Sequence, residues 1–147
     1  MTLSKHAKMG FSLVEALVVL LIVSFCMTLL TFRPSHEMLE KIESRLFFDQ
    51  VLAGLNLAQE VSILQQTQVY VRFWHSLPYV QFQIVGQSAS IQEVVIPDFW
   101  QIEQAFQFVY FPDGRTNQFD TVVFVHRDGH RAEIIFQLGS GKYELRQ

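Results

Sequence analysis

Residues 10–32 read GFSLVEALVVLLIVSFCMTLLTF and carry one charged side chain, that of Glu15. An α-helix rises about 1.5 Å per residue, so this run is long enough to cross a hydrocarbon layer of about 30 Å. We therefore predict a membrane-spanning helix over residues 11–33. A lone carboxylate in lipid is destabilising unless it is paired or neutralised, so Glu15 is the residue that most requires a functional explanation.

Two kinds of cleaved secretory signal compete with a membrane span for this stretch. A signal peptide needs small residues at spaced positions after its apolar core, but the core is followed by RPSHE at residues 33–37. A lipoprotein signal ending at Cys26 needs a small residue before the cysteine, where a bulky phenylalanine stands. A plain membrane anchor accounts for every residue except the Gly10–Phe11 junction and Glu15.

These exceptions form a pattern of their own. A glycine, a phenylalanine and a glutamate stand at positions 10, 11 and 15, at the head of the apolar run and behind a short basic leader. The pattern resembles the class III signal of type IV pilins and pseudopilins. The resemblance implies that a membrane prepilin peptidase removes residues 1–10 by cleaving between Gly10 and Phe11, and that the new N-terminus at Phe11 is methylated.

Cleavage would place a new amine four residues before Glu15, within the same low-dielectric layer. The amine of a neighbouring subunit is then the natural partner of the carboxylate. An ion pair buried in this way fixes register more reliably than it adds stability. We therefore expect Glu15 to direct assembly with other pilins or pseudopilins of the same fibre, because each incoming subunit would shift until an amine met a glutamate.

The remainder of the chain, residues 34–147, is long enough for one small domain. The basic leader favours the cytoplasmic side of a membrane, which sends this domain outward. We expect a single-pass cell membrane protein with its C-terminus outside, displayed at the cell surface once assembled.

Cys26 is the only cysteine, so the exported domain folds without a disulfide. The formal charge of −3 becomes more negative when the leader is removed, which disfavours nonspecific nucleic-acid binding.

Helical periodicity predicts an amphipathic helix over residues 35–66, after a kink at Pro34. Two adjacent apolar rows run along this helix. The first row contains Leu39, Ile42 and Leu46, and the second contains Phe47, Val51, Leu55 and Ala58. We expect the first row, together with Val51, to lie on a sheet, and Gly54 to be a mild weak point of the helix.

Beyond this helix, apolar and polar residues alternate with a period of two, which predicts strands. The predicted strands cover residues 69–74, 80–84, 91–96, 106–111, 121–126, 130–137 and 142–146. Asp128-Gly129 between two of them is a two-residue hairpin turn. The predicted fold class is therefore α+β: a long N-terminal helix, first membrane-spanning and then amphipathic, packed on an antiparallel β-sheet.

This order of elements is the pilin architecture, so the periodicity agrees with the processing signal. Residues 111–114, 120–124 and 138–142 look similar to segments of minor pseudopilins, and the chain most resembles the minor pseudopilins of competence systems. The resemblance implies a subunit of a type IV pilus-like apparatus that takes up DNA during transformation. The alternative is a minor pseudopilin of a type II-like protein secretion system, and a membrane-anchored enzyme or sensor is a third possibility.

No motif in the sequence predicts catalysis or a bound cofactor. The run GSGK at residues 139–142 resembles a phosphate loop, but it lacks the earlier glycine, the Ser or Thr after the lysine and the following helix. His126, Asp128 and His130 surround a hairpin turn and lack a further set of metal ligands. We therefore expect neither an enzyme nor a metal or cofactor site.

Four basic residues near the C-terminal end are the candidates for a contact with DNA. They are Arg127, Arg131, Lys142 and Arg146, which lie close together in the predicted strand meander. An ordinary solvated strand face is the simpler interpretation. We expect DNA to be an indirect or weak partner, while the main partners are other pilins or pseudopilins, the prepilin peptidase and the membrane.

Overall fold

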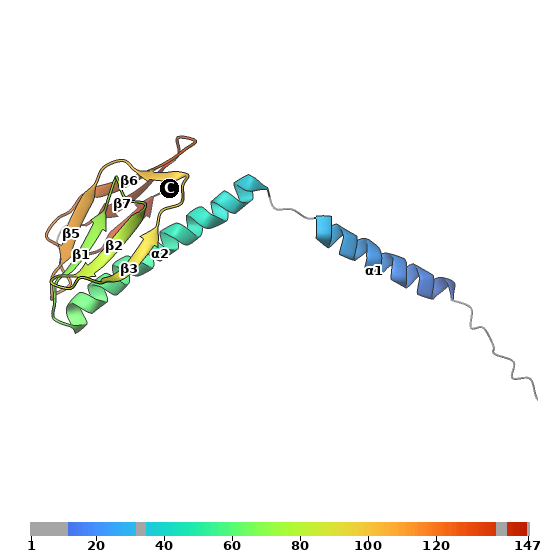
Figure 1. The fold of residues 1–147 in the computed structure, drawn as a ribbon, viewed down its shortest axis with the longest axis horizontal. Coiled ribbons are helices and arrows are strands. Elements are labelled where there is room, and N and C mark those ends of the chain that lie inside the picture. Colours follow the sequence, from blue (N-terminus) through green and yellow to red (C-terminus); the bar gives the residue numbers. More distant parts are fainter. Residues whose placement is uncertain (1–11, 32–34, 138–140, 147) are drawn as a thin grey trace, which may run out of the picture. The chain divides into compact units, whose positions relative to one another are not determined.

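Two units make up the chain in the computed structural model, Met1–Leu39 and Glu40–Gln147. The structure describes residues 12–31, 35–137 and 141–146. Over these residues the protein has two helices and antiparallel strands, so the predicted α+β class is confirmed (Figure 1). The predicted cleavage residues Gly10 and Phe11 and the predicted kink at Pro34 lie outside the described residues.

Helix α1, Leu13–Thr31, is apolar on every side, and all of its residues are exposed. Its threonine hydroxyls are satisfied inside the helix, because Thr28 Oγ1 donates to the Ser24 carbonyl and Thr31 Oγ1 donates to the Met27 carbonyl, both at 2.9 Å. In the hydrocarbon layer of a membrane no water is present, so polar groups must form their hydrogen bonds within the protein, as these hydroxyls do. Within the described residues, α1 is long and apolar enough to cross a membrane.

Helix α2, His36–Leu64, is amphipathic. Ser35 caps its start, since its Oγ accepts a hydrogen bond from the Met38 N–H at 3.3 Å. The residues that α2 buries recur every three or four positions and so share one side of the helix. They are Phe47, Phe48, Val51, Gly54, Leu55, Ala58 and Ser62.

The sequence-based expectation that the row of Leu39, Ile42 and Leu46 packs on the sheet is wrong. These side chains are 47%, 48% and 55% exposed, whereas Val51 is completely buried. Val51 follows Leu46 by five residues, and at about 100° per residue the two side chains point about 140° apart around the helix axis. They therefore cannot face the same layer. The adjacent rings of Phe47 and Phe48 select the buried side, because they remove more apolar surface from water than a leucine does.

Two four-stranded antiparallel sheets follow α2, where the sequence predicted one. The first has the order β3-β2-β1-β5 and consists of β1 (Val69–Phe73), β2 (Tyr79–Ile84), β3 (Ser90–Val95) and β5 (Phe106–Tyr110). The second has the order β4-β6-β7-β8 and consists of β4 (Trp100–Ile102), β6 (Thr121–His126), β7 (Arg131–Phe136) and β8 (Tyr143–Arg146). Strand β4 was not predicted. The predicted hairpin turn between β6 and β7 is confirmed, with Gly129 at φ 94°.

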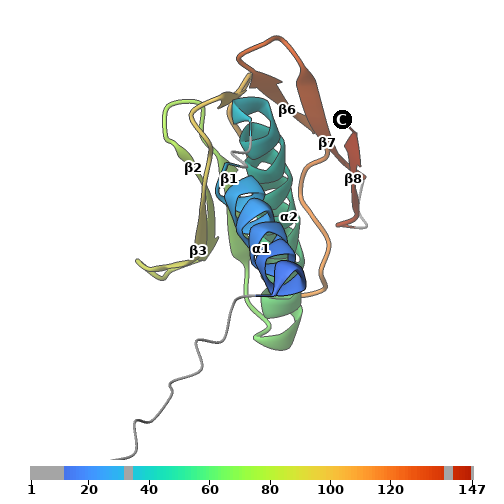
Figure 2. The same ribbon diagram turned by 90° about the vertical axis from the view of Figure 1, so that its right-hand side faces the viewer.

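Both sheets pack against α2, and Figure 2 shows β1–β3 to one side of this helix and β6–β8 to the other. The ring of Phe48 meets the ring of Phe124 on β6 edge to face, with centroids 5.4 Å apart. Phe73 on β1 also contacts Phe124, at 6.2 Å, and so joins the two sheets. A continuous aromatic core therefore joins α2 to both sheets.

Candidate assembly surface

Glu15 lies in the first turn of α1, three residues after Ser12. The Glu15 N–H donates to Ser12 Oγ at 3.2 Å, so Ser12 caps the helix. Ser and Glu at this spacing form the sequence signal of a capping box, which the sequence interpretation above overlooked. The Glu15 carboxylate is exposed and has no side-chain partner among the described residues, and it occupies the helix end where a negative charge is favourable.

The apolar surface of α1 is exposed along the whole helix. None of the residues Leu13–Thr31 is buried. A helix that is apolar all round is stable only in a protein core or in a membrane. The surface of α1 is therefore of the kind that a membrane can cover, and Glu15 lies in the first turn of this helix.

A second uncovered apolar surface lies on α2, on the side away from the sheets. We call it the outer row and define it as Ile42, Leu46, Ala53, Leu57 and Leu64, all of which are exposed. At about 100° per residue, these five positions fall within a sector of about 60° around the helix axis. The exposed Glu60 falls in the same sector, so the stripe is largely but not wholly apolar, and over six turns it has the form of a helix-packing seam. The spacing of the outer row can be recognised in the sequence, but the periodicity predicted that two of its residues, Ile42 and Leu46, lie on the sheet.

The predicted group of basic residues does not form a free cationic patch. Its four members are Arg127, Arg131, Lys142 and Arg146. Three of the guanidinium groups pair with carboxylates of the same chain: Arg127 with Glu40, Arg131 with Glu103 at 3.0 Å, and Arg146 with Glu144 at 3.0 Å. Partnered charges of this kind release few counterions on meeting DNA, which weakens the case for a direct phosphate contact.

The two histidines of the β6–β7 hairpin meet on one carboxylate. His126 Nδ1 and His130 Nδ1 lie 2.6 Å and 2.9 Å from Asp128 Oδ1. The backbone N–H of His130 also donates to this oxygen. The backbone and side-chain hydrogen bonds from His130, together with the contact to His126, hold the pKa of the Asp128 carboxyl well below its usual value. Over residues 12–31, 35–137 and 141–146, no group of three or more such side chains is arranged to hold a metal ion.

The glycine-rich run near the C-terminus is only partly described. Residues 138–140 lie outside the described residues. Gly141 has φ 67° and packs tightly, because a Cβ there would lie 2.5 Å from the Gly114 carbonyl oxygen and 2.5 Å from Gln59 Nε2. A close packing role explains this glycine without a phosphate.

Comparison with protein-family models, with curated proteins and with solved structures found no match. Function is therefore inferred from the residues around Gly10, from α1 with its single carboxylate, and from the outer row of α2.

Proposed function

We propose that this chain is a minor pseudopilin of a competence-type apparatus, a type IV pilus-like assembly that takes up DNA. A prepilin peptidase would cleave it between Gly10 and Phe11, and it would assemble through its N-terminal helices. The observation that carries the proposal is the Gly-Phe-x-x-x-Glu pattern at the head of an apolar run, whose helix α1 is exposed along its whole length.

The outer row of α2 supports an assembly role for the segment beyond the membrane. Helices with exposed apolar seams associate with other helices, because burying such a seam releases about 25 cal/mol per Å² of apolar surface. The outer row extends from Ile42 to Leu64, is interrupted by the exposed Glu60, and lies opposite the core side of α2. A subunit with two such surfaces is suited to be held in a fibre.

The pairing of Arg127, Arg131 and Arg146 with carboxylates favours a structural role over a direct grip on DNA. DNA would then be an indirect partner, reached through other subunits. The same geometry suits a minor pseudopilin of a type II-like secretion system. The two functions differ in what is lost when the chain is removed.

Processing is the first experiment. The full chain, co-expressed with a prepilin peptidase and extracted from membranes, should have the intact mass of residues 11–147 plus one methyl group. Gly10→Leu should leave the full-length precursor, whereas Ser4→Leu, a matched change inside the leader, should be processed normally. A mature protein that still carries Lys5 and Lys8 would refute the pseudopilin assignment.

Deletion in the natural host separates the two systems. Loss of transformation with an unchanged set of secreted proteins is the expected result. Normal transformation with a defect in secretion would instead favour the type II-like system.

A further inference from the structure

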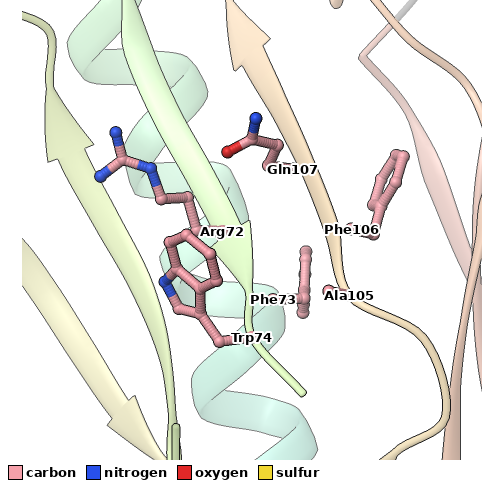
Figure 3. A pocket seen from close by; sticks show the side chains of 6 residues that line it. All are labelled: Arg72, Phe73, Trp74, Ala105, Phe106 and Gln107. Atoms are coloured by element: carbon pink, nitrogen blue, oxygen red, sulfur yellow. The ribbon is translucent and has the colours of Figure 1, made fainter. Parts of the chain in front are cut away.

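An open hollow that the assembly role does not use lies where β1 ends and β5 begins. Its lining residues are Arg72, Phe73, Trp74, Ala105, Phe106 and Gln107, and its volume is about 310 Å³. Arg72 lies on β1, Trp74 follows the last residue of that strand, and Gln107 projects from the neighbouring strand β5 (Figure 3). Arg72 and Gln107 are direct partners in the β1–β5 register. An aromatic ring and two hydrogen-bonding side chains therefore border one space.

The guanidinium of Arg72 is held in place by its surroundings. Its Nη1 donates to Gln83 Oε1 at 2.6 Å and to Gln81 Oε1 at 3.2 Å, and its Cζ lies 4.5 Å from the centroid of the Tyr70 ring. The other N–H groups of this guanidinium make no hydrogen bond to the described residues. Arg72 therefore presents pre-oriented donors that a ligand can accept, at little further cost in side-chain entropy.

Two other polar groups at the hollow are also without partners among the described residues. Trp74 is half-buried, and its indole N–H donates no hydrogen bond, while the exposed amide of Gln107 makes none. An amide offers both an acceptor oxygen and a donor NH₂ group. The hollow combines a flat apolar ring with donors and an acceptor at its border, the composition typical of small-molecule sites.

Trp74 also borders a second open hollow, of about 380 Å³, at the ends of the two sheets. The polar side chains there include Asp98 and Gln101, while Trp100 contributes a ring whose Nε1 already donates to Ser44 Oγ at 2.9 Å. Two hollows that share one indole suit a ligand made of linked units better than a single small molecule.

The charges at these hollows favour a neutral ligand. Among the described residues that line them, Arg72 is the one Lys or Arg, and Asp98 adds a negative charge. A nucleic acid strand would bring a phosphate with every unit and requires a groove with several cations. A purely apolar ligand would cover the unpartnered N–H groups of Arg72 and Trp74 without satisfying them, which is costly.

We propose that the hollow at Trp74 binds a neutral hexopyranose unit of a glycan chain. The C–H face of the sugar ring would stack on the Trp74 indole. Its hydroxyl groups, which both donate and accept, would pair with the Gln107 amide and with the free N–H groups of Arg72. This proposal is independent of the pseudopilin assignment, because it rests only on the side chains around Trp74.

The test is calorimetric titration of the full chain, in a zwitterionic detergent without a sugar headgroup, with cellotetraose and with N-acetylchitotetraose. We expect one of them to bind and the single sugar to bind more weakly. Trp74→Ala should weaken binding by about tenfold or more, the scale of a lost stacking contact. Gln107→Ala, at an exposed position, should weaken it without affecting folding.

Tyr79→Ala is the matched control, since Tyr79 lies on β2 of the same sheet but lines neither hollow. It should bind the tetrasaccharide like the unaltered chain. Absence of heat with both tetrasaccharides at millimolar concentration would overturn the proposal, as would equal binding by the Trp74→Ala and Tyr79→Ala variants. Displacement of a bound tetrasaccharide by a single-stranded oligonucleotide would overturn it in favour of a nucleic-acid ligand.

Discussion

A methyl group on Gly54 would lie 2.6 Å from both Cε2 and Cζ of Phe82, so α2 approaches β2 with no room for a side chain. Phe82 is 1% exposed and sits in the core. The sequence marks this glycine as a weak point of the helix, because glycine lowers helix stability by about 1 kcal/mol relative to alanine. The structure shows instead that its missing Cβ permits a close contact between α2 and Phe82 of the first sheet.

Gly54→Ala therefore sets two effects against each other, and their magnitudes decide the sign. The gain in helix propensity is about 1 kcal/mol, whereas forcing a buried ring to move costs about 1–3 kcal/mol. We expect a net loss in the free energy of unfolding, measured by urea titration of the full chain in detergent. The double variant Gly54→Ala with Phe82→Leu should lose less than the sum of the single changes, since the smaller side chain makes room. An alanine variant more stable than the unaltered chain would contradict the packing described.

The two sides of α2 predict opposite outcomes for the same substitution. Val51→Asp buries an unpaired carboxylate and should lower the free energy of unfolding by about 3–5 kcal/mol. Leu46→Asp, on the outer row, should change it by about 0.5 kcal/mol or less, because Leu46 is already 55% exposed. Tryptophan fluorescence during urea unfolding measures both, since Trp100 is bonded to Ser44 of α2.

Leu46→Asp has a second expected effect that rests on the proposed function. A carboxylate in the outer row should prevent close packing of α2 against a neighbouring subunit. The processed protein should therefore fold normally but be absent from the assembled fraction. Recovery of this variant in fibres at the normal level would show that the outer row is not an assembly seam.

Local patterns in the sequence were sufficient for the helices, most strands and the β6–β7 turn. They were not sufficient to choose between the two apolar rows of α2, because Leu46 and Val51 are equally apolar and the choice depends on which row meets a distant ring such as Phe124. Strand β4 is three residues long, too short for an alternation to be visible, and forms only through its pairing with β6.

Of the candidate sites, one could be predicted from contiguous sequence and the other depends on the fold. The Gly10, Phe11 and Glu15 pattern is contiguous, so it is legible without any structure. The hollow at Trp74 joins β1 to β5, and its members Arg72 and Gln107 are brought together only by the strand order of the first sheet. No local signal in the sequence connects them.

Burial of Tyr110 predicts sensitivity to alkaline pH. Its side chain is completely buried and its hydroxyl donates to the Gly141 carbonyl at 3.3 Å. Burial, with Tyr143 nearby, raises the pKa of Tyr110 far above the ordinary tyrosine value of about 10. Above that pH the unfolded chain loses the proton while the folded chain keeps it, so the stability that is intact below about pH 10 falls as the pH rises.

Tyr110→Phe removes this titration and should flatten the loss of stability on the alkaline side. Near neutral pH the same variant should be less stable by about 1 kcal/mol, because the hydrogen bond to Gly141 is lost. The measurement is the urea midpoint of both proteins at neutral and at strongly alkaline pH. Parallel curves over the whole range would mean that Tyr110 titrates alike in the folded and the unfolded chain.

The last prediction concerns Glu15 and rests on the proposed function. Glu15→Ala removes the one charged side chain of residues 11–32, so membrane insertion should be unchanged or improved. Assembly should suffer, because the amine of a neighbouring subunit would be left without its carboxylate in a low-dielectric layer, and an unpaired buried charge costs more than the intact pair contributes. Glu15→Gln keeps the size and part of the hydrogen bonding, so it should be intermediate.

Ser12→Ala is the matched control, because it removes the helix cap of α1 and leaves the carboxylate in place. Transformation frequency in the natural host is measured beside the membrane level of processed protein. Loss of transformation at a normal processed level would locate the defect in subunit docking, whereas normal transformation with Glu15→Ala would remove the assembly role of this residue.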